Sequence, residues 1–112
     1  MPNEETQNTP VEDTLELMTA ASVENCGLSE RELMLVRLTA LVAVGASPTS
    51  YVLNAGAAAE SSVTLEDVQD ILVAAAPIVG TARVVTAVGK IGKALGFVIG
   101  EIAEAEMATE AG

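Results

Sequence analysis

The sequence has no histidine, no tryptophan and a single cysteine, Cys26, and only 2% of its 112 residues are aromatic. Without histidine, one chain cannot assemble a Ser-His-Asp triad or a histidine-ligated metal site. With one cysteine, it can form neither an internal disulfide nor a CxxC redox pair. These absences remove most of the side chains with which enzymes carry out acid–base, metal and thiol chemistry.

Basic residues are also few: 5 Lys plus Arg stand against 16 Asp plus Glu, which gives a formal net charge of −11. Because nucleic acids are bound through clusters of Lys and Arg, this acidic balance argues against a nucleic-acid partner. Glu66, Asp67 and Asp70 lie close in sequence, but carboxylates are favoured at the start of any helix and no histidine accompanies them. We therefore expect a solvated acidic face, with no metal and no cofactor.

A long, unbroken apolar helix is missing as well. The longest uncharged run covers residues 38–59, but Gly45 and Pro48 lie inside it and are typical of a helix end and a helix start. Residues 1–8 are polar and acidic, unlike a signal peptide. Together with the unpaired Cys26, these features predict a cytoplasmic protein that does not enter a membrane.

Start and stop signals divide the sequence into about five helices, and no segment alternates with the period of two that a strand requires. The sequence therefore predicts an all-α fold. Residues 1–8 are expected to be disordered, residues 9–107 to form one helical domain, and residues 108–112 to be a flexible end. The helices are expected from Pro10 to about Asn25, from Ser29 through Val44, from Pro48 to about Glu60, from Thr64 to a stop at Pro77, and from Ile78 to about Met107.

The expected second and last helices both point to an assembly of several subunits. The second helix is apolar nearly all round, and so short a chain cannot surround it completely. The last helix, at about 45 Å, would exceed the width of a compact domain of this size, so it must bend, fray or project onto another subunit. Its glycines recur in the spacing of close helix contacts, with a bent helix as the alternative. These glycines are Gly89, Gly92, Gly96 and Gly100.

Three short segments occur in an informative order. Residues 28–32 read L-S-E-R-E, residues 64–68 read T-L-E-D-V, and residues 75–83 read A-A-P-I-V-G-T-A-R. From residue 28 to about residue 91, the chain resembles the carboxymuconolactone decarboxylase and AhpD-like alkylhydroperoxidase superfamily. The resemblance implies an AhpD-like helical domain that forms homo-oligomers, with a trimer or hexamer as the leading expectation. It implies peroxide reduction, or decarboxylation of a small lactone acid, as the activity.

The catalytic residues implied by this resemblance are replaced here. Counting back from Thr64 places the family's CxxC on Ser47 and Ser50 and its histidine on Asn54, while the glutamate of the peroxidase branch falls on Leu35. Serine cannot form the disulfide that thiol turnover needs, and a neutral amide cannot exchange protons near pH 7. We therefore favour a degenerate, oligomeric subunit that binds a small molecule or is structural. An active enzyme of the family remains the alternative hypothesis.

The candidate site residues keep two interpretations each. Ser47, Ser50, Tyr51 and Asn54 mark the equivalent of the family's pocket, or else Ser47 caps a helix and Asn54 makes a local polar contact. Cys26 is either an inert small hydrophobic residue or a thiol used in redox or intersubunit chemistry.

Two arginines stand in apolar surroundings and complete the set of candidates. Arg37 and Arg83 either form structural ion pairs, for which Glu60 and Asp70 are candidate partners, or bind the carboxylate of a ligand. An ion pair across a subunit interface would also satisfy the first of these interpretations.

Overall fold

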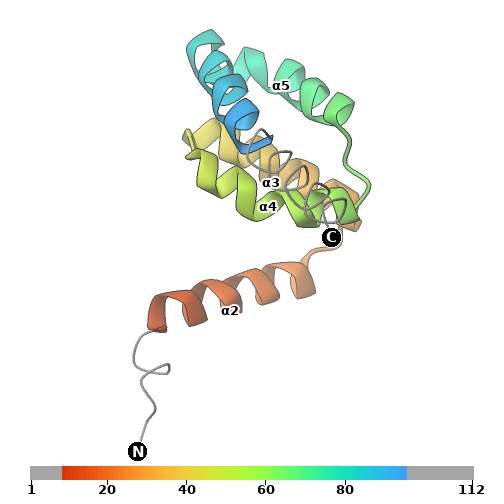
Figure 1. The fold of residues 1–112 in the computed structure, drawn as a ribbon. Helices are drawn as coiled ribbons and strands as arrows, with labels where there is room; N and C mark the ends of the chain where they lie inside the picture. The colour runs from red at the N-terminus through yellow and green to blue at the C-terminus, as the bar shows by residue number, and fades with distance from the viewer. Residues whose placement is uncertain (1–8, 96–112) are drawn as a thin grey trace, which may run out of the picture.

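The computed structural model describes residues 9–95, and this part of the chain is helical apart from short links (Figure 1). Because residues 9–95 contain no strand, the predicted all-α fold is confirmed. The expectations for residues 1–8, 96–107 and 108–112 lie outside the described residues. The helices are α2 (Pro10–Asn25), α3 (Glu30–Val44), α4 (Pro48–Glu60), α5 (Leu65–Val79) and a last helix that covers residues 81–95.

Two capping boxes begin α3 and α5 at the residues that the sequence predicts. The Ser29 hydroxyl accepts a hydrogen bond from the Glu32 backbone N–H at 3.1 Å, and the Glu32 carboxylate accepts one from the Ser29 N–H at 2.9 Å. Thr64 and Asp67 repeat this arrangement at the start of α5. Each box satisfies two backbone donors that a helix start would otherwise leave unpaired.

The end of α5 differs from the sequence prediction. Pro77 lies inside the helix, which continues to Val79 and ends at Gly80. Proline removes one backbone donor, but later residues can still bond to the preceding turn, as the Gly80 N–H does to the Ala76 carbonyl at 3.0 Å. Gly80 then adopts a φ of 88°, which few other residues tolerate, and the chain turns into the last helix. The prediction of a helix running on from Ile78 was therefore wrong at its start.

The core is built around α3, which packs between α4 and α5 (Figure 1). Met34, Leu38 and Val42 recur every four residues, so they form one buried face of α3. The opposite face stays open, since Val36 is 55% and Val44 71% exposed. The single chain therefore covers only one side of this apolar helix. The other buried residues of the core cluster are Tyr51, Ala58, Leu72, Ala87 and Ala94.

Helix α2 lies apart from the packed helices (Figure 1). None of its residues is buried. The radius of gyration is 16.8 Å, against about 13 Å for a compact domain of this length, in keeping with a projecting helix. Among residues 9–95, no helix combines the length and the apolar character needed to cross a membrane.

Candidate functional site

The polar candidates on α4 bond to their own helix. Ser47 is the N-cap residue, as one interpretation of the sequence has it, but its side chain makes no capping hydrogen bond. The Asn54 side-chain amide donates to the Ser50 backbone carbonyl at 2.8 Å. This contact occupies the amide with a local backbone group and builds no relay from Asn54 to a nucleophile.

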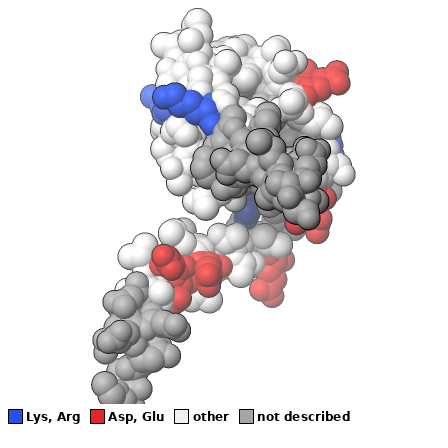
Figure 2. Space-filling view, in the orientation of Figure 1, with Lys and Arg blue, Asp and Glu red and all other residues white. Residues whose placement is uncertain are grey.

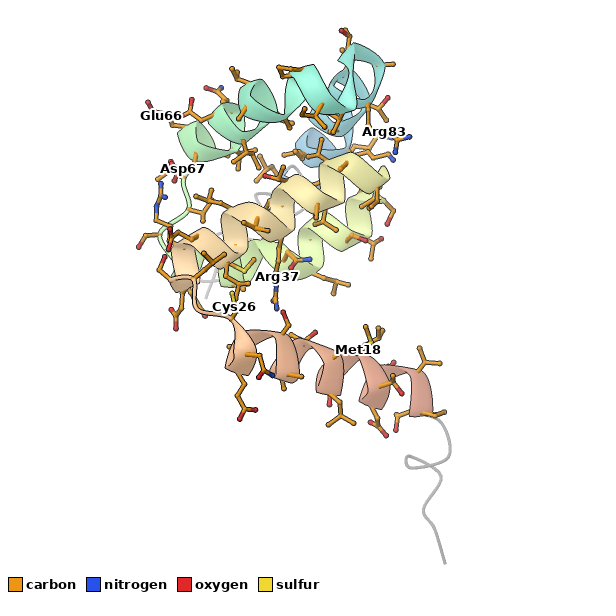
Figure 3. The ribbon with its side chains drawn as sticks, turned by 180° about the vertical axis from the view of Figure 1, so that it is seen from behind. Met18, Cys26, Arg37, Glu66, Asp67 and Arg83 are labelled. Atoms are coloured by element: carbon orange, nitrogen blue, oxygen red, sulfur yellow. The ribbon has the colours of Figure 1, made fainter. Side chains whose placement is uncertain are left out.

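Cys26 and Arg37 both lie on the side of the molecule that faces α2 (Figure 3). The cysteine is half-buried in the link between α2 and α3, outside the start of α4 where the family's thiols are expected. Arg37 points from α3 toward α2 and donates to the Ser22 hydroxyl at 3.1 Å. This hydrogen bond therefore links the later part of α2 to α3, while the rest of α2 stays apart from the packed helices.

Arg83 lies at the carboxyl end of α3, whereas Arg37 projects from the middle of that helix toward α2 (Figure 3). The Arg83 guanidinium donates to the Ala43 carbonyl at 3.1 Å, and the Lys90 ammonium donates to the Gly45 carbonyl at 2.9 Å. Cations are favoured at the carboxyl end of a helix, where carbonyl groups are left unpaired. The two side chains line a shallow polar depression together with Thr86. Sequence reasoning did not single out Lys90, because its carbonyl partner lies 45 residues away.

The ion pair in the described residues joins Arg31 to Asp67 at 2.5 Å, across α3 and α5. Neither Arg37 nor Arg83 contacts Glu60 or Asp70, the partners that sequence reasoning considered, within residues 9–95.

The charges around this pair serve the helix starts. A hydrogen bond from the Thr64 backbone N–H is the main reason why the pKa of Asp67 lies below its ordinary value, and Arg31 adds to the effect. Hydrogen bonds from Ser29 likewise lower the pKa of Glu32. Both carboxylates are thus occupied as caps, and residues 9–95 contain no group of three or more side chains placed to hold a metal ion.

A cavity of about 170 Å³ lies between α3, α4, α5 and the last helix. Tyr51 is the one sequence candidate that lines this cavity, and the residue is only 5% exposed. Burial raises the pKa of the Tyr51 hydroxyl above its ordinary value of 10.0, so the hydroxyl stays protonated near neutral pH. The rest of the wall is mainly aliphatic and includes Leu38, Ala55, Val68, Ile71 and Ile91.

The sequence candidates therefore occupy separate places instead of one site. Tyr51 lies at the apolar cavity, Arg83 at the polar depression, and Arg37 at the contact with α2. The aliphatic wall was missed, because alanines at helical spacing look the same in sequence whether they line a cavity or pack against a neighbour.

Comparison with known proteins gives one match. The sequence model of the carboxymuconolactone decarboxylase family matches residues 10–91. No curated protein sequence and no solved structure matches the chain. The matched region begins with α2 and ends within the last helix, so it extends the resemblance, which started at residue 28, toward the N-terminus. Because the match covers well over half of the sequence, the chain belongs to the carboxymuconolactone decarboxylase family.

Proposed function

We propose that this chain is a homo-oligomeric member of the family that binds a small molecule and does not use thiol chemistry. The start of α4 carries this proposal. The positions to which the resemblance assigns two cysteines and a histidine hold Ser47, Ser50 and Asn54, and the Asn54 amide is bonded to the Ser50 carbonyl. The unpaired Cys26 suits a reducing compartment, so the proposal includes a cytoplasmic location.

The proposed loss of thiol chemistry is tested by activity. Peroxide consumption and decarboxylation of a small lactone acid should both equal the protein-free blank. The Cys26→Ser variant should behave as the unchanged protein does, because Cys26 precedes α3 while the start of α4 follows its far end. Turnover that disappears in Cys26→Ser would overturn the proposal and support an active enzyme that uses a different thiol position.

The proposed assembly is supported by an apolar stripe on α2, made of Val11, Leu15 and Met18. These residues lie at i, i+4 and i+7, so they share one face of the helix. They are 70%, 55% and 63% exposed, although Met18 projects on the side where the packed helices lie (Figure 3). Apolar surface of this kind is stabilised when another surface removes it from water. A second copy of the chain provides such a surface, and a trimer or hexamer is the proposed assembly.

The assembly is tested by native mass spectrometry and light scattering on the full chain. We expect the unchanged protein to be a trimer or hexamer, and the double variant Leu15→Glu/Met18→Glu to dissociate. Leu17→Glu is the matched control, because Leu17 is 72% exposed on the opposite face of α2 and should leave the assembly intact. A monomeric unchanged protein, or an assembly that survives the double variant, would overturn this part of the proposal.

A further inference from the structure

The cavity beside Tyr51 owes its space to small side chains on α4. Ala55, Ala58 and Ala59 all line it, and each leaves room that a larger aliphatic side chain would fill. The volume of about 170 Å³ is similar to that of aliphatic cavities of about 150 Å³ that take up benzene. The space therefore fits a molecule with a single six-membered ring.

Among residues 9–95, the wall of the cavity carries no charge. The lining residues in this part of the chain include no Asp, Glu, Lys or Arg, so a carboxylate or an ammonium group would lose its hydration there without gaining a counter-charge. Thr64 also lines the cavity, and its hydroxyl already accepts the capping hydrogen bond from the Asp67 N–H. The wall therefore selects a neutral and mainly apolar molecule.

Tyr51 adds one polar group to this apolar wall. The residue is only 5% exposed, yet its hydroxyl forms no hydrogen bond within residues 9–95. In this part of the chain, every fully buried side-chain oxygen or nitrogen has a hydrogen-bond partner. Because the Tyr51 hydroxyl has none, its oxygen is not fully buried and can still be reached. Buried tyrosine hydroxyls usually have a hydrogen-bond partner. Because this hydroxyl is protonated near neutral pH, it can donate to an oxygen atom of a ligand.

We infer that this cavity binds a neutral, single-ring molecule with one acceptor oxygen, to which the Tyr51 hydroxyl donates a hydrogen bond. The inference rests on the proposed small-molecule function and names its ligand class. It separates this chain from a binder of ionised lactone acids, because Arg83 and Lys90 lie at the polar depression and not at the cavity.

The test adds three probes of similar size to the full chain and measures their binding by NMR titration. Cyclohexanone carries the acceptor oxygen, methylenecyclohexane replaces that oxygen with carbon, and cyclohexanecarboxylate carries a negative charge. We expect cyclohexanone to bind and to shift signals of α4 and α5, while cyclohexanecarboxylate leaves them unchanged. Equal binding of the carboxylate, or no binding of cyclohexanone, would overturn the inference.

Two variants locate the binding. Tyr51→Phe should weaken the binding of cyclohexanone by about fivefold, the usual contribution of one hydrogen bond. It should leave the binding of methylenecyclohexane unchanged. Ala55→Leu should abolish binding of both by filling the cavity, while Ala57→Leu, on an exposed part of α4 outside the lining, should change neither. If Ala55→Leu fails to fold, Ala59→Leu serves in its place. Cyclohexanone binding that is unchanged in Tyr51→Phe would exclude the hydroxyl as donor.

The outcomes for the inference and for the proposed function can be told apart. If the chain forms an oligomer, shows no turnover and binds none of the three probes, the inferred ligand class is wrong and the chain is a structural subunit. A chain that binds cyclohexanone at the cavity but shows turnover dependent on Cys26 would keep the cavity assignment and overturn the loss of thiol chemistry.

Discussion

At the scale of single residues, the acidic side chains with the clearest structural roles are the caps of α3 and α5. Glu32 and Asp67 each accept a backbone hydrogen bond at a helix start, and both have lowered pKa values. The spacing S-x-x-E and T-x-x-D makes these two contacts predictable from sequence alone. The ion pair of Arg31 with Asp67 was not predictable, because it depends on how α3 packs against α5 across 36 residues of chain.

The Glu32 cap predicts a dependence of stability on pH. Its pKa lies below the ordinary value of 4.5 in the folded chain, so its stabilisation is complete above that value and is lost as the pH falls through the lower folded pKa. Glu32→Gln should therefore flatten the fall in unfolding free energy below about pH 4.5, as measured by urea unfolding between pH 7 and 3. Glu30→Gln removes the same charge two residues earlier, at a position that is not part of the capping box. It should flatten the fall in unfolding free energy less. Identical profiles for the two variants would contradict the role of the cap.

Substitution of Gly45 and of Gly56 by alanine should change the stability of the fold in opposite directions. The φ of Gly45 is +69°, and a Cβ there would lie 2.8 Å from the Arg83 Nη1 atom. Gly45→Ala should destabilise the fold by about 1 to 2 kcal/mol, from the left-handed backbone alone, and also displace Arg83 from the Ala43 carbonyl. Gly56→Ala, inside α4 with open space around it, should stabilise by up to about 1 kcal/mol. Thermal unfolding of both variants checks the prediction, which fails if the two shifts have the same sign.

At the scale of elements, the sequence predicts helices better than it predicts what surrounds them. The starts of α3 and α5 follow from their capping boxes, and the start of α4 follows from Pro48 at its first position. The end of α5, in contrast, depends on whether the chain can accommodate Pro77 for one more partial turn. The position of α2 was not predictable, since its apolar stripe fits contact with its own chain as well as with another. Local patterns fix which face is apolar, and tertiary packing decides what covers that face.

The glycine spacing of the last helix leads to a prediction at this scale. Among the described residues, nothing lies near a Cβ built at Gly92, so Gly92→Ala disturbs no contact within residues 9–95. If the proposed assembly uses this helix, we expect Gly92→Ala to weaken subunit association, because small residues at this spacing permit close helix approach. Sedimentation at several protein concentrations measures the effect. An unchanged assembly with a gain of about 1 kcal/mol in stability would show instead that Gly92 faces solvent.

At the scale of the whole molecule, the net charge of −11 must be reconciled with extensive exposed apolar surface. Acidic side chains and uncharged surface lie next to each other on α2 (Figure 2). The composition gives the net charge, and the apolar pattern of the second helix predicts incompletely covered apolar surface, but neither predicts how the two are arranged. For the same reason, sequence analysis named Arg37, Tyr51 and Arg83 together as candidate ligand-site residues, and the fold places them apart. Spacing along the chain does not say which way each helix turns its residues.

The combination of apolar contact and like charge predicts how salt affects assembly. Subunits that carry a charge of −11 repel one another, and Glu12, Asp13 and Glu16 lie on the same helix as the apolar stripe of α2. Salt screens this repulsion, with a Debye length of about 10 Å at 0.1 M, while the burial of apolar surface is retained. Raising NaCl from about 0.02 M to about 0.3 M should therefore strengthen association in analytical ultracentrifugation. Leu15→Glu/Met18→Glu should remain dissociated at both concentrations, and association that weakens with salt would indicate an interface held by ion pairs instead of apolar contact.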